Sequence, residues 1–463
     1  MINYSKAKNF SNLYELKYQN GLEKYLPLID LVHLKALKKI KRIPFKNYKK
    51  LNSFFLEEIK NGYNPKNYIP DDIYQNRNFI LDKKLKYDYK YIHIGRARRD
   101  VINTALSLST RDKLIQLIKV INDFSSQILK TTKLQRKTIF PDFTYNQKAQ
   151  PNYLSHYLLS FIFPQLRVLN NLRGSLDKCL LYHGSIGALN GTSINIDRKM
   201  IAKNLKFKGL IINTRDAMWP IDIYLEISSG IINYLVVVER LINDLIFFNS
   251  YNNSYITLDK NDVRDSVIMP QKKNPFTLNM SKACIRELIS FNSLIISSNL
   301  SQTGQVESRT HIYSLPKKIE LTISLLDSLM QTIKGIKFQK KNMQDDANDI
   351  CLYSTEITDK ITKITKLPNR DIYNIVKKVI NKNDKINFDK ILTRELKKYN
   401  NKIEIHKILL QIRKINSEEI LLNRKTLGGG SLKSIDSMIK KCSDEIKNNN
   451  QIYLKLKKFL TYR

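Results

Sequence analysis

The sequence predicts an all-α protein organised around a central bundle of long helices. Apolar residues recur every three or four positions through long segments, which is the spacing of one buried face of an α-helix. No stretch shows the alternation of apolar and polar residues that is typical of a half-buried strand. The 463 residues are enough for two or three domains and a large core. Five long helical segments are expected, which suffice for an up-and-down bundle: 99–130, 151–172, 221–248, 280–300 and 318–333.

The chain is strongly basic, with a formal net charge of +37 that comes mostly from lysine. Such a charge is typical of proteins that bind nucleic acid or an acidic membrane surface. The lysines are spread through the chain, however, together with many Asn, Ile and Tyr residues, a combination that an A/T-biased genome encodes. No zinc-ligand spacing, RNA-binding aromatic motif or arginine-rich arm accompanies them. We therefore favour coding bias over a selected charge, and nucleic acid is not an expected partner.

The cysteine and hydropathy patterns indicate a soluble protein of the cytoplasm. The four cysteines lie far apart and form no metal-ligand pair, as expected for reduced thiols inside a cell. The N-terminus lacks the apolar core of a signal peptide. The most apolar run, 227–238, lies between Glu226 and Glu239 and is too short to span a bilayer. We expect no membrane contact.

The segment Asp265–Pro275 separates two of the long apolar segments and differs from both in composition. Two prolines, which oppose helix formation, flank two lysines, and an amide and a hydroxyl lie beside them. Two interpretations stay open at this point. The segment is either a helix–helix connection with solvated lysines, or a mobile loop that brings a base, a cation and an amide onto one substrate.

A second unusual stretch is His93–Asp100, in which three of four consecutive residues are arginines around Ala97. Gly95 permits a close approach of the backbone, and clustered guanidinium groups form a dense anion site. The alternative is a basic helix start on the surface.

These stretches resemble motifs of the argininosuccinate lyase family of the fumarase/aspartase superfamily. Met269–Pro275 matches the family's loop at seven consecutive positions, and His93–Asp100 is similar to its motif H-T-G-R-S-R-N-D. Further similar segments follow in the family's order along most of the chain, from about residue 24 to 437: 141–151, 154–159, 187–198, 213–217 and 427–432.

The resemblance implies a three-domain protomer with a central bundle of long helices. The expected domains are a helical N-terminal domain at 1–95, a bundle domain at 96–345 with the signature loop at 264–276, and a small helical domain at 346–463. It also implies a homotetramer whose active sites are each shared between subunits. The implied substrate is argininosuccinate, with no cofactor and no metal.

The family's reaction is a β-elimination that releases fumarate and arginine. By resemblance, Ser266 is the catalytic base, while Lys272 and Asn274 stabilise the charge that collects on the substrate carboxylate. Thr144 matches a substrate-binding position, and Tyr145 takes the place of a catalytic histidine. The other expected substrate-binding residues are Arg96, Arg98 and Gln305.

The chain departs from the family at several site positions. The histidine replaced by Tyr145 normally works with a glutamate, and that position is Asn279 here. This His–Glu pair transfers the proton of the leaving nitrogen, so both residues of one proton-transfer pair are replaced here. Smaller departures are found at Ala97, Arg99, Asp265, Val267 and Ser308.

Two functions therefore stay open. The first is an argininosuccinate lyase of impaired activity, favoured because Ser266, Lys272 and Asn274 are retained together. The second is a catalytically inactive relative that serves as an assembly or scaffold subunit, since a fold does not fix a function.

Overall fold

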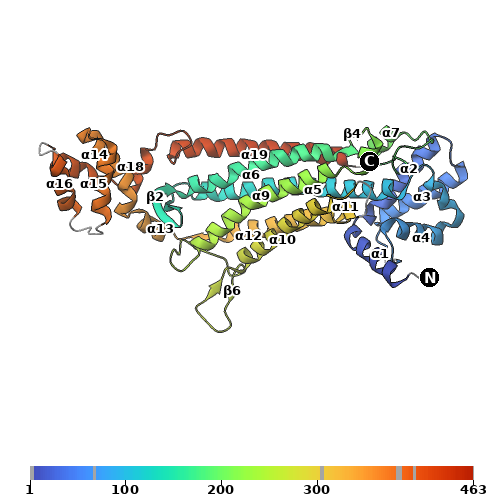
Figure 1. Cartoon of the computed structure of the whole chain (residues 1–463), viewed down its shortest axis with the longest axis horizontal. Helices are drawn as coiled ribbons and strands as arrows, with labels where there is room; N and C mark the ends of the chain where they lie inside the picture. Colours follow the sequence, from blue (N-terminus) through green and yellow to red (C-terminus); the bar gives the residue numbers. More distant parts are fainter. Residues whose placement is uncertain (1–4, 66–68, 303–306, 382–387, 400–402, 462–463) are drawn as a thin grey trace.

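The computed structural model describes residues 5–65, 69–302, 307–381, 388–399 and 403–461. It confirms the all-α expectation: an elongated molecule in which long helices run side by side, with a cluster of shorter helices at each end (Figure 1). None of the helices within these ranges is both long enough and apolar enough to cross a membrane.

Among the described residues, six long helices form the central bundle, and the five predicted segments are among them. Helix α5 packs against α6, α12 and α19, while α9 packs against α6 and α10. Leucine and isoleucine side chains at three- and four-residue spacing supply the shared core. The bounds of the helices are α5 (Arg98–Leu134), α6 (Leu154–Cys179), α9 (Ile221–Phe248), α10 (Phe276–Ser298), α12 (Leu315–Gly335) and α19 (Leu432–Leu460).

Helix α9 carries apolar side chains both on the face that the bundle buries and on a face that stays exposed in a single chain. Ile227, Leu235 and Val238 are fully buried in the bundle. Val236, in contrast, is 49 % exposed, and Met280 of the neighbouring helix α10 is 53 % exposed. Within a single chain, the other helices thus bury α9 on one side.

The N-terminal cluster has a small core of its own and a buried group of charges. Arg77 is almost inaccessible and donates hydrogen bonds to both Asp30 and Glu58. Asp30 also pairs with Arg96, which ties the cluster to the start of the bundle. The elements are α1 (Lys6–Gln19), η1 (Glu23–Tyr25), α2 (Leu26–Lys39), α3 (Phe45–Asn61), α4 (Ile73–Leu85) and η2 (Lys86–His93).

The predicted C-terminal domain, 346–463, needs a correction. Its first part forms a separate apolar core, but α19 runs back along the bundle and places Ile435, Cys442 and Ile446 in the bundle core. The shorter helices on the C-terminal side are α13 (Lys340–Ala347), η4 (Ile350–Tyr353), α14 (Ser354–Thr365), α15 (Asn369–Asn381), α16 (Phe388–Tyr399), α17 (Ile405–Arg413) and α18 (Ser417–Leu422).

In the part of the chain that the structure describes, four short two-stranded ladders interrupt the helices. The segment 141–151 lies in the longest of them, in which β1 (Ile139–Thr144) pairs antiparallel with β2 (Gln147–Tyr153). The others are β3 (Leu181–Tyr182) with β4 (Gly209–Leu210), β5 (Ile256–Thr257) with β8 (Lys337–Phe338), and β6 (Arg264–Asp265) with β7 (Lys273–Asn274). The remaining short helices are α7 (Arg198–Asn204), α8 (Thr214–Met218), α11 (Glu307–Thr310) and η3 (Ile312–Ser314).

The buried charge group of the N-terminal cluster yields a stability prediction. Replacing Arg77 with Met leaves Asp30 and Glu58 without their shared cation, so we expect the free energy of unfolding to fall by about 3–5 kcal/mol. Urea denaturation followed by circular dichroism measures this loss. The matched control is Lys50→Met, which removes an exposed ion pair with Asp88 and should cost less than about 1 kcal/mol. Equal losses in the two variants would contradict the prediction.

Candidate active site

The signature loop folds as a β-hairpin that stands away from the bundle. Strands β6 and β7 pair Arg264 with Asn274 and Asp265 with Lys273. The pairing continues toward the tip of the hairpin, because the Ser266 amide donates to the Lys272 carbonyl at 3.1 Å. The Asn274 side chain donates to the Arg264 carbonyl at 3.0 Å. Ser266, Lys272 and Asn274, which the sequence singled out together, therefore belong to one small hydrogen-bonded hairpin.

The hydroxyl of Ser266 is itself held in place. Its Oγ accepts a hydrogen bond from the Met269 amide at 3.1 Å. A donor aimed at Oγ stabilises negative charge on that oxygen. The hairpin also carries Arg264, Lys272 and Lys273 against a single carboxylate, Asp265, so it presents a positive charge to an anionic substrate.

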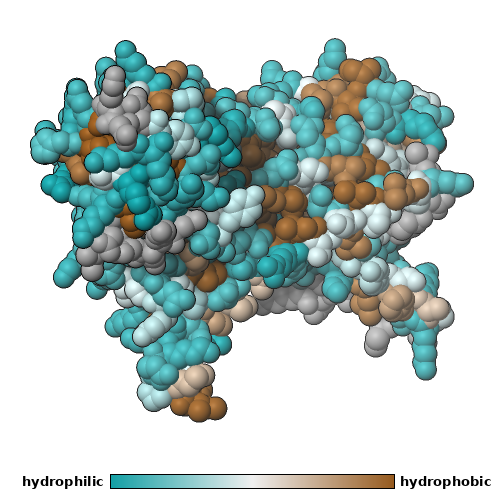
Figure 2. Space-filling view, turned by 60° about the vertical axis from the view of Figure 1, so that its left-hand side comes forward, coloured by the Kyte–Doolittle hydropathy of each residue, from teal (hydrophilic) through white to brown (hydrophobic). Residues whose placement is uncertain are grey.

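The tip of this hairpin is apolar and uncovered. Val267 is fully exposed and Ile268 is 87 % exposed. The hairpin projects below the bundle in Figure 1, and a projection at the lower left of Figure 2 ends in hydrophobic side chains. Large apolar side chains in such a position are typical of a surface that packs against something else.

The β1–β2 hairpin carries Thr144 and Tyr145 at its turn. Tyr145 and Asn146 both have positive φ, 53° and 57°, which is the backbone of a two-residue hairpin turn that matches the twist of the strands. Tyr145 is 98 % exposed, and Thr144 beside it is exposed as well. In a single chain, then, the phenol that replaces the family's histidine points into solvent.

The β1–β2 hairpin is fixed to helix α13 close to its turn. Asp346 accepts an ion-paired hydrogen bond from Lys148 at 2.8 Å and a hydrogen bond from the Tyr255 hydroxyl at 2.5 Å. Burial, and after it the contact with Asp346, raises the pKa of Tyr255, so this hydroxyl stays a donor. Asp346 was not among the residues that the sequence indicated, because its partners are about 90 and 200 positions away in the chain.

The arginine-rich octet leads into helix α5, and its arginines Arg96 and Arg98 lie in different environments. Arg98 is 45 % exposed and forms an ion pair with Asp72 at 2.8 Å. Arg96 is only 3 % exposed and points inward to Asp30 at 2.7 Å. Arg96 was expected to bind substrate. Its burial instead favours a structural role, and Arg98 is the member of the pair with a face open to a ligand.

The backbone of the octet is held by Asp100 and by the close packing at Gly95. The Asp100 carboxylate accepts from the Ala97 amide at 2.8 Å and from the Ile186 amide at 2.6 Å, and burial raises its pKa. Gly95 has a φ of 68°, and a Cβ there would lie 2.5 Å from Ile196. The close backbone approach predicted for Gly95 is confirmed. Asp100 was not singled out from the sequence, although an acid at the third position of a helix is a signal that could have found it.

Two further site positions have different outcomes. Asn279, at the position of the family's glutamate, donates its amide to the Pro275 carbonyl at 3.0 Å. It is thus a neutral group engaged with its own helix. Gln305, an expected substrate-binding residue, lies outside the described residues.

One chain does not bring the candidate residues together. Arg98 is the first residue of α5, and the hairpin with Thr144 and Tyr145 follows the last residue of that helix. A helix of 37 residues is about 55 Å long. The signature hairpin lies on the half of the bundle nearer to the β1–β2 hairpin (Figure 1). Arg98 and the Thr144–Tyr145 turn therefore lie at opposite ends of α5, and the signature hairpin projects from the bundle at a third place (Figure 1).

Comparison with known proteins gives the family. A family model described as Lyase matches residues 56–287, which is half of the chain and includes the octet, both hairpins and the start of α10. The chain belongs to this lyase family. Its membership extends to the fumarase/aspartase superfamily, whose motifs it carries in order.

Curated relatives match over most of their length. The argininosuccinate lyase of Pelagibacter ubique is 28 % identical over 424 residues, which cover 89 % of this lyase and 90 % of the relative. The argininosuccinate lyase of Methanocaldococcus jannaschii is 26 % identical over 420 residues, with 89 % and 86 % covered. These identities are modest, so the relatives indicate the superfamily more firmly than the substrate.

Solved structures show the same fold. An EDDS lyase variant with bound fumarate superposes with a TM-score of 0.82 at 19 % identity, covering 99 % of this chain and 94 % of that one. A class II fumarase from Schistosoma mansoni gives a TM-score of 0.65 at 14 % identity, with 91 % and 94 % covered. At such identities the likeness is one of architecture.

The attachment of the β1–β2 hairpin can be tested without assaying a reaction. Asp346→Ala removes the acceptor of both Lys148 and Tyr255, so we expect amides 139–153 to exchange hydrogen about tenfold faster, because local opening costs less. Hydrogen–deuterium exchange read by mass spectrometry gives the rates. Asp123→Ala, which removes an exposed pair with Lys119 on α5, is the control and should leave the hairpin unchanged. An unchanged hairpin in Asp346→Ala would show that Asp346 does not hold it.

Proposed function

We propose that the protein is an argininosuccinate lyase, which splits argininosuccinate into arginine and fumarate in arginine biosynthesis. The observation that carries the proposal is the signature hairpin, in which Ser266, Lys272 and Asn274 are held by one set of backbone contacts. The named relatives, which match along nine-tenths of the chain, support the same substrate.

The proposed reaction is a β-elimination that starts at Ser266. Its Oγ takes the proton from the carbon next to a substrate carboxylate, and the electron pair moves into that carboxylate. The Lys272 ammonium and the Asn274 amide stabilise the charge. The C–N bond then breaks, fumarate forms, and the nitrogen of arginine leaves with a proton. The hydrogen bond from the Met269 amide to Oγ favours the charged form of the base.

Proton delivery to the leaving nitrogen is where this chain differs. Tyr145 lies at the position of the family's histidine, and its phenol is the group that we assign to this step. Phenols ordinarily hold their proton up to about pH 10, so they are weak acids at neutral pH. Asn279 cannot assist by exchanging a proton, since an amide does not titrate in this range. We therefore expect activity below that of relatives with a histidine.

We propose that the working unit is a homotetramer with shared sites. Two features support this. Arg98 and the hairpin with Thr144 and Tyr145 lie at opposite ends of a helix about 55 Å long, and apolar side chains remain uncovered on α9, on α10 and at the tip of the signature hairpin. Packing several copies around the bundle would cover these surfaces and place Arg98 of one copy near Ser266 of another.

A second candidate is a catalytically inactive relative that assembles with other subunits. The observation in its favour is the paired replacement of histidine and glutamate by Tyr145 and Asn279, the latter bonded to its own helix. The two candidates differ in one property: an inactive subunit would assemble normally and release no fumarate.

The first test of activity follows fumarate by its ultraviolet absorbance after argininosuccinate is added to the purified protein. Ser266→Ala removes the base, and we expect kcat to fall by about 10²–10⁴-fold. Ser290→Ala, an exposed serine of α10 bonded to the Arg286 carbonyl, serves as the control and should keep full activity. Absence of fumarate from the folded parent protein would refute the lyase proposal and favour the inactive subunit.

Shared sites are tested by mixing two inactive variants. Arg98→Ala and Ser266→Ala damage different ends of the bundle, so a mixed assembly contains some sites with both residues intact. After the variants are unfolded together and refolded, we expect up to about one quarter of the parent activity if each site takes these residues from different copies. A mixture as inactive as its components would place both residues of each site in one copy, against the shared-site proposal.

A further inference from the structure

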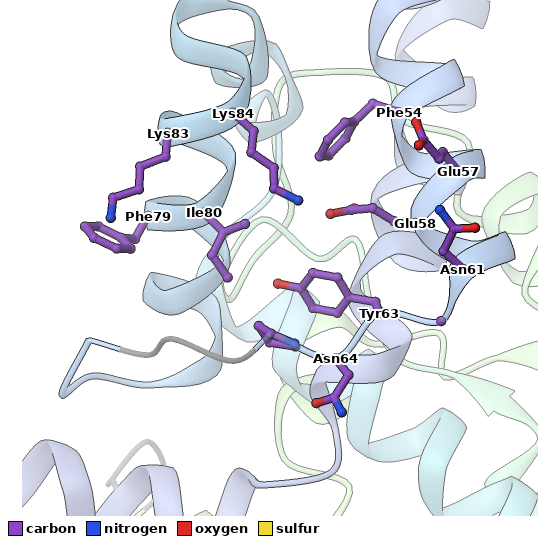
Figure 3. Close-up of a pocket in the computed structure, with 12 residues that line it drawn as sticks. Phe54, Glu57, Glu58, Asn61, Tyr63, Asn64, Phe79, Ile80, Lys83 and Lys84 are labelled. Atoms are coloured by element: carbon purple, nitrogen blue, oxygen red, sulfur yellow. The ribbon is translucent and has the colours of Figure 1, made fainter.

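The N-terminal cluster contains a pocket that the proposed reaction does not use. It has a volume of about 550 Å³ and lies between α3 and α4, with the segment 62–65 below it (Figure 3). This volume is within the range of small-molecule sites, about 300–1,000 Å³. Helices α3 and α4 lie at the outer end of the molecule, away from the signature hairpin (Figure 1).

The walls of the pocket combine aromatic faces with two cations. Phe54 comes from α3, Phe79 from α4, and Tyr63 from the segment between them. The Lys84 ammonium lies 5.5 Å from the centre of the Phe54 ring, and the Lys83 ammonium 4.2 Å from the centre of the Phe79 ring. In Figure 3 the Lys84 side chain and the Tyr63 hydroxyl both point into the open space. Burial raises the pKa of Tyr63, so its hydroxyl remains a hydrogen-bond donor.

The charge of the pocket is positive because its buried acid is already neutralised. Glu58 at the floor accepts two hydrogen bonds from Arg77, at 3.0 and 2.7 Å. Glu57 at the rim is the one further carboxylate among the lining residues. Within the described residues no carboxylate pairs with Lys83 or Lys84. The lining therefore carries two ammonium groups, of Lys83 and Lys84, against the one carboxylate of Glu57 that Arg77 does not neutralise.

The floor of the pocket is linked to the arginine-rich octet by buried ion pairs. Arg77 bridges Glu58 and Asp30, and Asp30 pairs with Arg96 at 2.7 Å. The Arg77 guanidinium also stacks on the pocket residue Tyr63, 4.6 Å from the ring centre. A ligand that moves Tyr63 therefore acts on a continuous chain of contacts that ends at the start of α5.

We propose that this pocket binds a small anion that carries a planar ring, of the size of a mononucleotide or an aromatic carboxylic acid. The aromatic walls suit stacking on a ring, and the lysines suit a phosphate or carboxylate. The amides of Asn61 and Asn64 and the carboxylate of Glu57 supply hydrogen-bond partners for polar ring atoms. Binding here is separate from the elimination reaction, so the proposal stands or falls independently of the proposed function.

The test is isothermal titration calorimetry of the full chain with two probes, AMP and phenylpyruvate. We expect saturable binding of at least one probe with a Kd below about 1 mM, and a loss of about tenfold in affinity in Lys84→Glu, whose charge reversal repels the anion. Phe54→Ala should weaken the same probe by removing the stacking face. Inorganic phosphate, which has the charge without the ring, should bind much more weakly.

The control variant is Lys90→Glu, which makes the same charge change in the same cluster. Lys90 also lies over an aromatic ring, Tyr87, at 5.4 Å, but does not line the pocket. It should leave affinity within about twofold of the parent, and thermal unfolding confirms that every variant is folded. The proposal is overturned if neither probe binds, if phosphate binds as tightly as the probe, or if Lys84→Glu has no more effect than Lys90→Glu.

Discussion

The length and rigidity of helix α5 is the constraint on which the rest of the structure depends. It packs against α6, α12 and α19, so its apolar faces organise most of the bundle core. It also separates Arg98, at its first turn, from the hairpin that follows its last turn. A packed helix of this length cannot bend enough to join its ends. Any site that uses both ends must take them from different molecules, as in the assembly that we propose.

Most of the candidate catalytic residues lie on two hairpins. One hairpin is held by its own backbone, and the other is held by contacts that are distant in sequence. The signature hairpin supports itself through paired strands and the hydrogen bond at Ser266. The β1–β2 hairpin depends on Asp346, which joins Lys148 and Tyr255 to α13. In the proposed reaction, Lys272 and Asn274 keep the role of stabilising charge, while Tyr145 takes the place of the histidine that exchanges a proton with the leaving nitrogen. Such an enzyme would keep the means to form the carbanion-like state and would have a weaker acid for the step that follows.

Buried charges give the N-terminal cluster its connection to the rest of the molecule. Taking Arg77, Asp30 and Glu58 out of water is costly unless each has a partner of good geometry. The observed bonds, between 2.7 and 3.0 Å, meet that condition and extend it to Arg96. A network of this kind fixes one arrangement of helices, since a shift of one ion leaves another unpaired. The same network forms the floor of the pocket between α3 and α4 and links that pocket to the octet.

The sequence by itself determined the fold class, the five long bundle helices and the identity of the signature motif, because apolar periodicity and short motifs are local properties. Local reasoning also indicated the close approach at Gly95. The tertiary structure alone decided that α19 returns to the bundle, that 141–151 pairs as strands, and that Arg96 is buried on Asp30 while Arg98 stays accessible. Each of these depends on a partner far away in the chain, and one sequence carries no record of such pairings. The resemblance implied sites shared between subunits, but the positions of the candidate residues along the bundle became visible only when the direction of each helix was known.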